Sequence, residues 1–196
     1  MAKRVWKPGN MLYPLPVVLV STADKEGHDN ILTIAWTGTV CTDPPMLYIS
    51  VKKERYSYHL LKESGEFVVN LASESLKKAV DWCGVRSGAS YDKWKEMKLS
   101  RGEAKALTYA PVIRESPVNI ECKVSEVKEL GSHDMFLAKV MAVQAEDAYL
   151  DGHGRFDFSA VHPITYSHGA YFCLGKELGS FGWSVKKKKK KKRGRT

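Results

Sequence analysis

The sequence predicts a mainly β protein, a barrel or a sandwich with a few short peripheral helices. Short runs of β-branched and aromatic residues recur at near-regular spacing and are separated by turn residues. Only two or three stretches have helical character, and the strand-then-helix alternation of a doubly wound fold is absent. The chain has 196 residues, the size of one domain that buries its own core.

The elements are expected in the following order. The expected strands are residues 16–21, 30–35, 46–51, 67–71, 118–127 and 135–143, and residues 164–174 close the folded body. Alternation of apolar and polar residues along 118–127 predicts a half-exposed strand. Helices are expected at 57–62 and 74–83, the second with Ser73 as N-cap, because its hydroxyl can accept from free first-turn amides. Residues 84–100 are polar and turn-rich, so we expect a functional loop there rather than core.

The net charge of +9 is concentrated at one end of the chain. Residues 186–195 hold nine of the 31 basic residues, so the remaining 22 balance the 22 acidic residues. A block of like charges repels itself, so we expect one folded domain over residues 1–180 and a disordered Lys/Arg-rich tail over 181–196. Such a tail is able to bind polyanions. The neutral body and the absence of interleaved aromatic residues argue against a nucleic-acid-binding function.

The cysteines are too far apart to form a recognisable metal or redox motif. They are Cys41, Cys83, Cys122 and Cys173. We expect free, buried or half-buried thiols in a reducing compartment and no metal site. A redox role for Cys41 or Cys83 is the alternative to plain packing. The apolar stretch 15–20 is too short for a signal core or a membrane span, so we expect a cytoplasmic protein with no membrane partner.

The common catalytic and phosphate-binding motifs are absent from the sequence. It contains no G-x-S-x-G elbow, no G-x-x-x-x-G-K-[ST] loop and no H-E-x-x-H pair. The run 152–154 (Gly-His-Gly) does not extend to G-x-G-x-x-G, because Asp157 occupies the last position. A cofactor must therefore be held by another kind of site.

Residues 33–45 are the most informative segment for ligand binding. Small and hydroxylated side chains gather there at the end of an expected strand. A planar ligand needs close approach to backbone amides, which small side chains permit, and Trp36 is able to stack on an aromatic ring. The alternative, favoured by composition alone, is a Thr-rich exposed strand with Trp36 in the core.

Residues 50–58 join an expected strand to an expected helix. Arg55 and the hydroxyls of Ser50 and Ser57 lie near the start of that helix. Free helix amides together with an arginine and hydroxyls form a site for a phosphate group. The alternative, again favoured by composition alone, is a solvated charged turn with a serine cap.

The order of several segments resembles the flavin reductase-like family, and its flavoredoxin branch in particular. The segments are PLPVVLVS (14–21), AWTG (35–38), DPPMLYIS (43–50), RYSY (55–58), SGEFVVN (64–70), CGVRSG (83–88), DKW (92–94), GSHDMFLAKV (131–140) and PITY (163–166) with Tyr171. Each segment alone is weak, but the ordered set is specific and covers about residues 10–175.

This resemblance implies an FMN-binding split β-barrel of Greek-key type, usually a homodimer with the flavin near the subunit interface. It implies that the isoalloxazine edge lies along Thr33, Ile34, Ala35, Trp36, Thr37 and Gly38. It implies a ribityl and phosphate site that includes Ser50, Val51, Arg55, Tyr56 and Ser57, with Ser87, Gly88 and Lys93 closing over the phosphate side. In relatives that oxidise NADH or NADPH, a histidine in a Gly-x-His pattern lies by the nicotinamide. His133 matches that pattern, and its alternative is a plain turn residue.

Two functions within this fold follow from the resemblance. The first is an NAD(P)H-dependent flavin reductase that passes electrons from FMN to a small-molecule or protein acceptor. The second is a flavoredoxin-like electron carrier that does not react with NAD(P)H. The sequence contains no dinucleotide-binding motif that decides between them.

Overall fold

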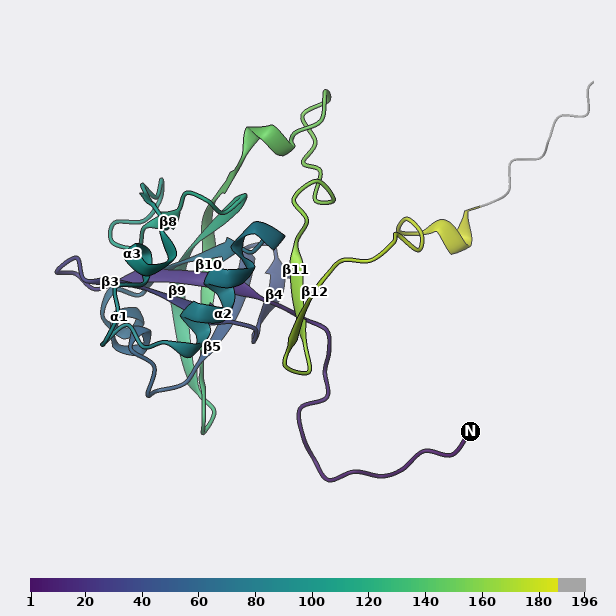
Figure 1. The fold of residues 1–196 in the computed structure, drawn as a ribbon, viewed down its shortest axis with the longest axis horizontal. Coiled ribbons are helices and arrows are strands. Elements are labelled where there is room, and N and C mark those ends of the chain that lie inside the picture. The colour runs from purple at the N-terminus through teal and green to yellow at the C-terminus, as the bar shows by residue number, and fades with distance from the viewer. Residues whose placement is uncertain (187–196) are drawn as a thin grey trace, which may run out of the picture.

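The structure, a computed structural model that describes residues 1–186, is built around one large antiparallel sheet (Figure 1). The seven strands, in spatial order, are β3 (Asp29–Ile34), β2 (Val18–Ala23), β6 (Glu66–Leu71), β9 (Val118–Glu129), β10 (Asp134–Ala145), β5 (Pro45–Val51) and β4 (Thr37–Thr42). Three hairpins, β2–β3, β4–β5 and β9–β10, supply six of these strands, and β6 joins the first hairpin to the third.

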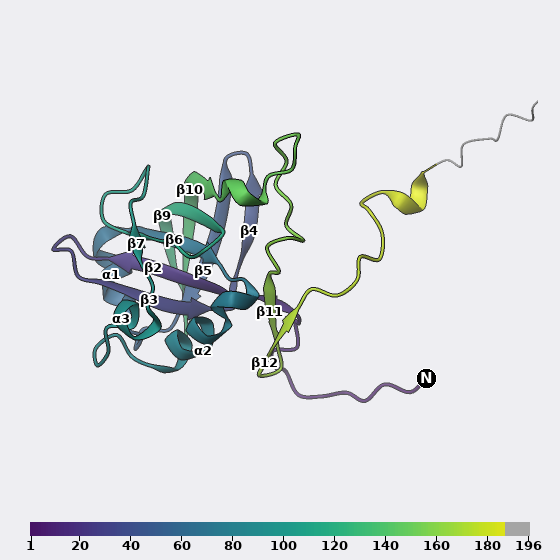
Figure 2. The ribbon, with the colours of Figure 1, turned by 45° about the horizontal axis from the view of Figure 1, so that its top comes forward.

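The remaining elements are short and lie around the large sheet. The smaller sheets contain β1 (Leu15–Pro16), β11 (Ile164–Ser167) and β12 (Ala170–Cys173), and β7 (Arg101–Gly102) with β8 (Val112–Ile113). The helices are α1 (Ser57–Ser64), α2 (Lys77–Val85) and α3 (Lys93–Met97), with 3-10 turns at Glu74–Leu76, Asp147–Tyr149 and Trp183–Val185. Figure 2 shows α2 and α3 beside β3, and both terminal segments running away from the body.

The predicted mainly β architecture with short peripheral helices is confirmed, and every expected strand is present. The expected loop at residues 84–100 was wrong in part, because it contains α3 and the buried Trp94. Asp92 starts this helix, since its carboxylate accepts hydrogen bonds from the amides of Trp94 and Lys95. One short amphipathic turn within a polar segment therefore contributes to the core.

Two local predictions need correction. Ser73 makes no side-chain capping bond: its hydroxyl lies 2.7 Å from that of Ser75, and a 3-10 turn precedes α2. The strand expected to be half-exposed is so from Lys123 onward, but its first part is buried, because Asn119 and Glu121 on its polar face are covered. Both cases arise from neighbouring segments that the local pattern does not report.

The core has two apolar layers on opposite faces of β2. Val18 and Val20 pack into the layer enclosed by the sheet, which also contains Phe67 and Phe136. Leu19 packs into the layer between the sheet and the helices α2 and α3, together with Ile31, Val80 and Trp94. Both faces of β2 are therefore covered, and every residue of the strand is buried, including the polar Ser21 and Thr22.

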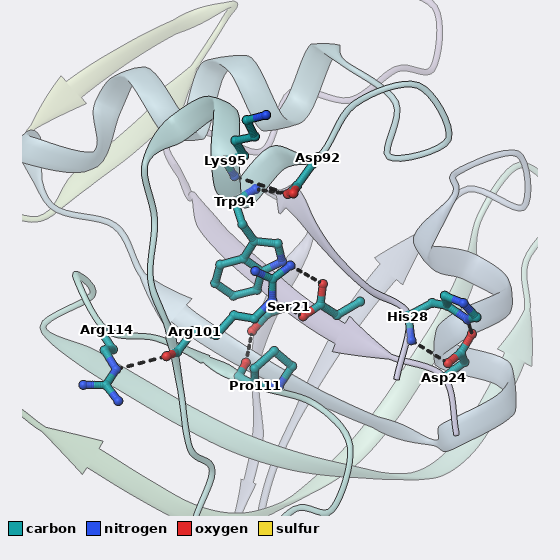
Figure 3. A network of polar contacts seen from close by, with 10 residues as sticks. Ser21, Asp24, His28, Asp92, Trp94, Lys95, Arg101, Pro111 and Arg114 are labelled. Atoms are coloured by element: carbon teal, nitrogen blue, oxygen red, sulfur yellow. Dashed lines mark hydrogen bonds and ion pairs between the residues drawn. The ribbon is translucent and has the colours of Figure 1, made fainter. Parts of the chain in front are cut away.

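Arg101 clamps the long connection between α3 and β9 onto the sheet. Its guanidinium makes two hydrogen bonds to Asp29 on β3, at 2.5 and 2.9 Å. The guanidinium also lies 4.7 Å from the ring centroid of Trp94, and Figure 3 shows the two side chains stacked. A bidentate ion pair combined with a cation–π contact fixes the connection more firmly than a simple surface ion pair.

The buried carboxylate of Glu121 holds the same connection at a second point. Glu121, fully buried on β9, accepts hydrogen bonds from the amides of Lys105 and Ala106 and from the Gln144 side chain. Burial alone raises the pKa of Glu121, but the amide of Lys105 and the other donors outweigh burial, and the net pKa is lowered. The carboxylate is thus the stable form in the folded protein.

Replacing Glu121 by glutamine is expected to lower the free energy of unfolding by about 1–3 kcal/mol at pH 7, because an amide N–H₂ would face amide donors. The folded pKa of Glu121 is depressed, so its contribution is present above the unfolded pKa and is lost as the pH falls through the folded value. Urea unfolding at pH 7 and at pH 4 measures both effects. The matched control is Glu126→Gln, on an exposed position of β9. An equal loss in both variants would contradict this role.

The predictions for the cysteines and for the C-terminal tail have different outcomes. All four cysteines are free; Cys83 and Cys122 are buried, Cys41 is half-buried, and Cys173 is exposed rather than covered. The predicted domain boundary at residue 180 stays a prediction, and residues 187–196 of the expected tail lie outside the described residues. Within residues 1–186 no helix has the length and apolar character needed to cross a membrane.

Candidate functional site

Two adjoining cavities lie where the ends of β3 and β5 meet the start of α1. The first, about 220 Å³, is lined by Leu32, Thr33, Ile34, Ala35, Trp36, Ser50, Val51, Lys52, Arg55, His133 and Tyr166. The second, about 250 Å³, is lined by Asn30, Leu32, Glu54, Arg55, Tyr56, Val85, Arg86, Ser87, Gly88 and Lys93. Leu32 and Arg55 line both, so the cavities form one elongated site, called here the first and second compartments.

The end of β3 lines the first compartment and is tied to α2. The Thr33 hydroxyl donates to the carbonyl of Val80 on α2, so its proton is not available to a ligand. A side chain at Gly84 would bring its Cβ within 3.3 Å of Thr33 Cβ, so the glycine lets α2 approach the strand. The Ser50 amide donates to the Trp36 carbonyl at 2.9 Å, which links the two strand ends that border the compartment.

Trp36 and His133 form an aromatic wall at the mouth of the first compartment. Their ring centroids are 4.3 Å apart with an interplanar angle of 37°. His133 Nδ1 and Ser132 Oγ lie 2.9 Å apart. Burial, with the Lys52 charge next in importance, lowers the pKa of His133. The imidazole is therefore neutral at neutral pH and able to donate or accept a hydrogen bond.

The second compartment carries a surplus of positive charge. Arg55, Arg86 and Lys93 line it, against the single carboxylate of Glu54. Glu54 pairs with Lys52 at 3.4 Å, so its charge is already compensated. Arg55 is fixed between the compartments, because one guanidinium N–H donates to the Gly84 carbonyl at 3.0 Å. This composition suits an anionic group such as a phosphate.

Lys93 lines the second compartment from a buried position. The side chain is buried, and its ammonium donates to the carbonyls of Ile31 and Cys83, each at 2.8 Å. Burial lowers the pKa of Lys93 to about 8, and the Arg55 charge adds to this lowering. Lys93 thus joins α2 and β3 under the cavity floor, with one ammonium proton left for a ligand.

Gly88 allows close packing at the second compartment. A Cβ at this position would lie 2.6 Å from Tyr56 Cδ1 and still closer to the amide oxygen of Asn30. Asn30 is itself fixed, because its Nδ2 donates to the buried hydroxyl of Ser57 at 2.8 Å. The absence of a side chain at Gly88 therefore preserves the shape of this end of the site.

Most of the site residues expected from sequence line one of the two compartments, and three do not. Thr37, Gly38 and Ser57 lie outside both linings. The Thr37 hydroxyl donates to the Tyr48 carbonyl, and Gly38 packs against the Tyr48 ring. Ser57 contacts Asn30, which lines the second compartment, and accepts a hydrogen bond from its side-chain amide. The assignment of all these residues to a cofactor stays a prediction.

Several residues that line the compartments were not predicted from the sequence. They are Asn30, Leu32, Lys52, Glu54, Val85, Arg86 and Tyr166. Strand periodicity could have identified two of them, because Asn30 and Leu32 share a face of β3 with Ile34. Arg86 follows the C-terminal turn of α2, and only the fold brings it close to Arg55.

The described residues offer little for metal or thiol chemistry. Within residues 1–186 no three His, Cys, Asp or Glu side chains converge on a possible metal position. Burial raises the pKa of the Cys83 thiol to about 11, so plain packing describes it better than a redox role.

Comparison with known proteins identifies the family. Residues 10–175 match the model described as "Flavin reductase like domain". The flavoredoxin of Desulfovibrio vulgaris (Miyazaki F) superposes with a TM-score of 0.86 at 28% identity, over 94% of this chain and all of that one. The flavoredoxin of Methanosarcina acetivorans gives 0.83 at 29%, also over 94% of this chain and all of that one. An uncharacterized protein of Archaeoglobus fulgidus is 32% identical over 76% of this chain and 83% of its own length.

These matches extend over the elements that build the two compartments, and the neighbouring folds are split-barrel flavin reductase folds. The chain belongs to the flavin reductase-like family, has the split β-barrel fold of the flavoredoxins, and has a flavin-binding function of the oxidoreductase type.

Proposed function

We propose that this chain is an FMN-dependent flavin reductase, which accepts hydride from NADH or NADPH and passes electrons to a small-molecule or protein acceptor. The observation that supports this most directly is the elongated site, with an aromatic-walled compartment adjoining a cationic one. An isoalloxazine ring suits the first compartment and a phosphate the second. Family membership supports the binding of a flavin, and the two-compartment shape of the site supports FMN as that flavin.

Three features of the residues present fit this cofactor. The end of β3 lines the first compartment, and the Thr33 hydroxyl is directed to the Val80 carbonyl on α2. Arg55 lines both compartments and carries donors toward an anion. Gly88 leaves space that a Cβ would fill. The site residues that line a compartment and would hold FMN are Thr33, Ile34, Ala35, Trp36, Ser50, Val51, Arg55, Tyr56, Ser87, Gly88 and Lys93.

Bound FMN supplies the hydride and electron chemistry, and the chain supplies orientation, charge and shelter. Arg55 and Arg86 neutralise the phosphate and fix one end of the cofactor. Trp36 covers an aromatic face and keeps water from it. His133 stays uncharged at neutral pH and offers a ring nitrogen to a nicotinamide amide at the compartment mouth. Lys93 holds the floor beneath the second compartment.

The second candidate is an electron carrier that takes electrons from another protein. The similarity to two flavoredoxins at 28 and 29% identity favours it. The stacking of His133 on Trp36 also favours it, because a nicotinamide must displace or share that wall. Both candidates require bound FMN, and they differ in whether NAD(P)H reduces it.

We also propose a homodimer. The terminal segments project from the body (Figure 1). They expose large apolar side chains, Trp6 near one end and Phe181 and Trp183 near the other. Exposed apolar groups of this size on extended chain are typical of surfaces that pack against a partner. Analytical ultracentrifugation at several protein concentrations tests the proposal, and a monomer throughout would contradict it.

The function is tested by the absorbance spectrum of the purified protein, recorded again after anaerobic addition of NADH or NADPH. Peaks near ~370 and ~450 nm indicate bound flavin, and reverse-phase chromatography identifies it as FMN. Bleaching by a nicotinamide supports the reductase, and bound FMN without bleaching supports the carrier. A colourless protein that also fails to bind added FMN would contradict both.

Replacing His133 by asparagine is expected to slow flavin reduction by NAD(P)H about 10- to 100-fold, because misplacement of a reactant by ~1 Å has an effect of that size. FMN retention should change little. Stopped-flow absorbance measures the rate, with His153→Asn on an exposed loop as control. A reduction rate equal to that of the unmodified protein would exclude His133 from nicotinamide binding.

A further inference from the structure

Asp134 is a fully buried carboxylate one residue beyond His133. Its Oδ2 accepts a hydrogen bond of 2.5 Å from the hydroxyl of Tyr58 on α1. Its Oδ1 has no hydrogen-bond partner and lies 3.6 Å from Nζ of Lys53. Lys53 also donates to Glu129 at the exposed end of β9, at 3.3 Å. The pair Asp134–Tyr58, with Lys53 beside it, is called here the hairpin anchor.

The hairpin anchor lies directly under the turn that presents His133. Asp134 is the first residue of β10 and pairs with Glu129 on β9 and Val51 on β5. The Leu130 amide donates to the His133 carbonyl and closes the turn. Because successive side chains along an extended chain point to opposite faces, a buried Asp134 directs His133 outward. There His133 meets Trp36.

The other half of the anchor comes from the segment that carries Arg55. Lys53 precedes Arg55 by two residues, and Tyr58 follows it by three. The Tyr58 amide donates to the Arg55 carbonyl at 2.8 Å, so the helix start and Arg55 form one unit. The hydrogen bond to Asp134 raises the pKa of Tyr58 to about 12, so the hydroxyl keeps the proton that it donates. The anchor thus connects the cationic end of the site to the His133 turn.

A buried carboxylate is a poor choice for stability alone, because an apolar side chain of similar volume is often at least as stabilising at such a position. Its directional bond to Tyr58 ties the start of β10 to α1, which apolar contact does less specifically. We propose that Asp134 and Tyr58 are positioning residues, which hold the β9–β10 turn so that His133 lies against Trp36 at the mouth of the first compartment. The effect on hydride transfer rests on the proposed function, whereas the geometric effect does not.

The test begins with flavin-free protein and uses Tyr58→Phe, which removes only the hydroxyl. We expect the His133 ring resonances in NMR spectra to move toward those of an exposed histidine, because the Trp36 ring current no longer acts on them. Cross-relaxation between the His133 and Trp36 rings should weaken. Asp134→Asn retains an oxygen that can accept from Tyr58, so it should keep most of the His133 ring-current shift and of the His133–Trp36 cross-relaxation. Asp134→Leu should lose both.

The control is Glu129→Gln, which removes only the exposed partner of Lys53 and should leave the His133 resonances in place. Circular dichroism and thermal melting establish that each variant is folded. If Asp134→Leu does not fold, Tyr58→Phe still decides the question. Unchanged His133 shifts and His133–Trp36 cross-relaxation in folded Tyr58→Phe would overturn the proposal.

The second readout uses the protein loaded with FMN. Tyr58→Phe is expected to slow reduction by NAD(P)H about tenfold while the KM for FMN stays within twofold, because orientation rather than cofactor binding is disturbed. A changed NMR signature with an unchanged rate would support the geometric claim and overturn the catalytic one. If the unmodified protein fails to bind FMN, the NMR result still decides the geometric claim.

Discussion

Replacing Arg55 by methionine is expected to weaken FMN binding about 10- to 100-fold, because one charge-assisted hydrogen bond contributes about 1.5–3 kcal/mol. Arg55 lines both compartments and is held in place by the Gly84 carbonyl, whereas Arg86 and Lys93 line only the second. The FMN affinity of Arg55→Lys should lie between those of the unmodified protein and Arg55→Met, since lysine retains the charge but loses the planar guanidinium. Fluorescence titration of flavin-free protein with FMN measures these affinities.

A matched ligand makes this prediction specific to the phosphate. Riboflavin has the same ring and ribityl chain but no phosphate, so Arg55→Met should leave its affinity within about twofold if the contact is purely to phosphate. Arg155→Met, in an exposed loop, controls for loss of net charge. Equal weakening of FMN and riboflavin would show that Arg55 shapes the site rather than binding the phosphate.

The strands were predictable because their patterns are local. The strand β2 begins with an apolar run, and the hairpin that it forms with β3 is marked by a polar turn. The first compartment was predictable in outline for the same reason: most of its lining comes from residues 32–36 and from the end of β5 with the residues that follow it, while His133 and Tyr166 come from distant parts of the chain.

The helix α3 was missed because its decisive contacts are not local. Its segment is polar, and the two features that make it helical core are the Asp92 cap and the packing of Trp94. Trp94 is covered by Arg101 (Figure 3), and Arg101 is in turn fixed by Asp29 on β3. A short sequence window around Trp94 contains the capping residue Asp92 but not the distant residues that cover the Trp94 side chain.

Lys93 illustrates the same limit within the site. The resemblance implies that Lys93 closes over the phosphate side of the cofactor, and this assignment stays a prediction. Two of its ammonium protons go to the carbonyls of Ile31 and Cys83, which are 62 and 10 residues away along the chain. Only the packing of α2 against β3 creates that pair of acceptors. The direction of a long side chain is therefore a tertiary property, even where its residue type is informative.

Gly88→Ala is expected to weaken FMN binding about 10- to 100-fold and to lower the free energy of unfolding by about 1–3 kcal/mol, the usual range for overpacking. The new Cβ would lie 2.6 Å from the Tyr56 ring and closer to Asn30. Asn30 cannot yield freely, because it is buried and bonded to Ser57. Flavin titration and urea unfolding measure the two effects.

Two further variants separate this clash from a general sensitivity to alanine. Gly152→Ala places a Cβ in open space, at a glycine without a positive φ, and should change neither quantity. The double variant Asn30→Ala with Gly88→Ala removes the obstructing amide, so its loss of stability should be smaller than the sum of the single losses. Strict additivity would mean that the clash with Asn30 is not the cause. Recovery of stability without recovery of FMN affinity would indicate that Asn30 itself contributes to the second compartment, beyond fixing its shape.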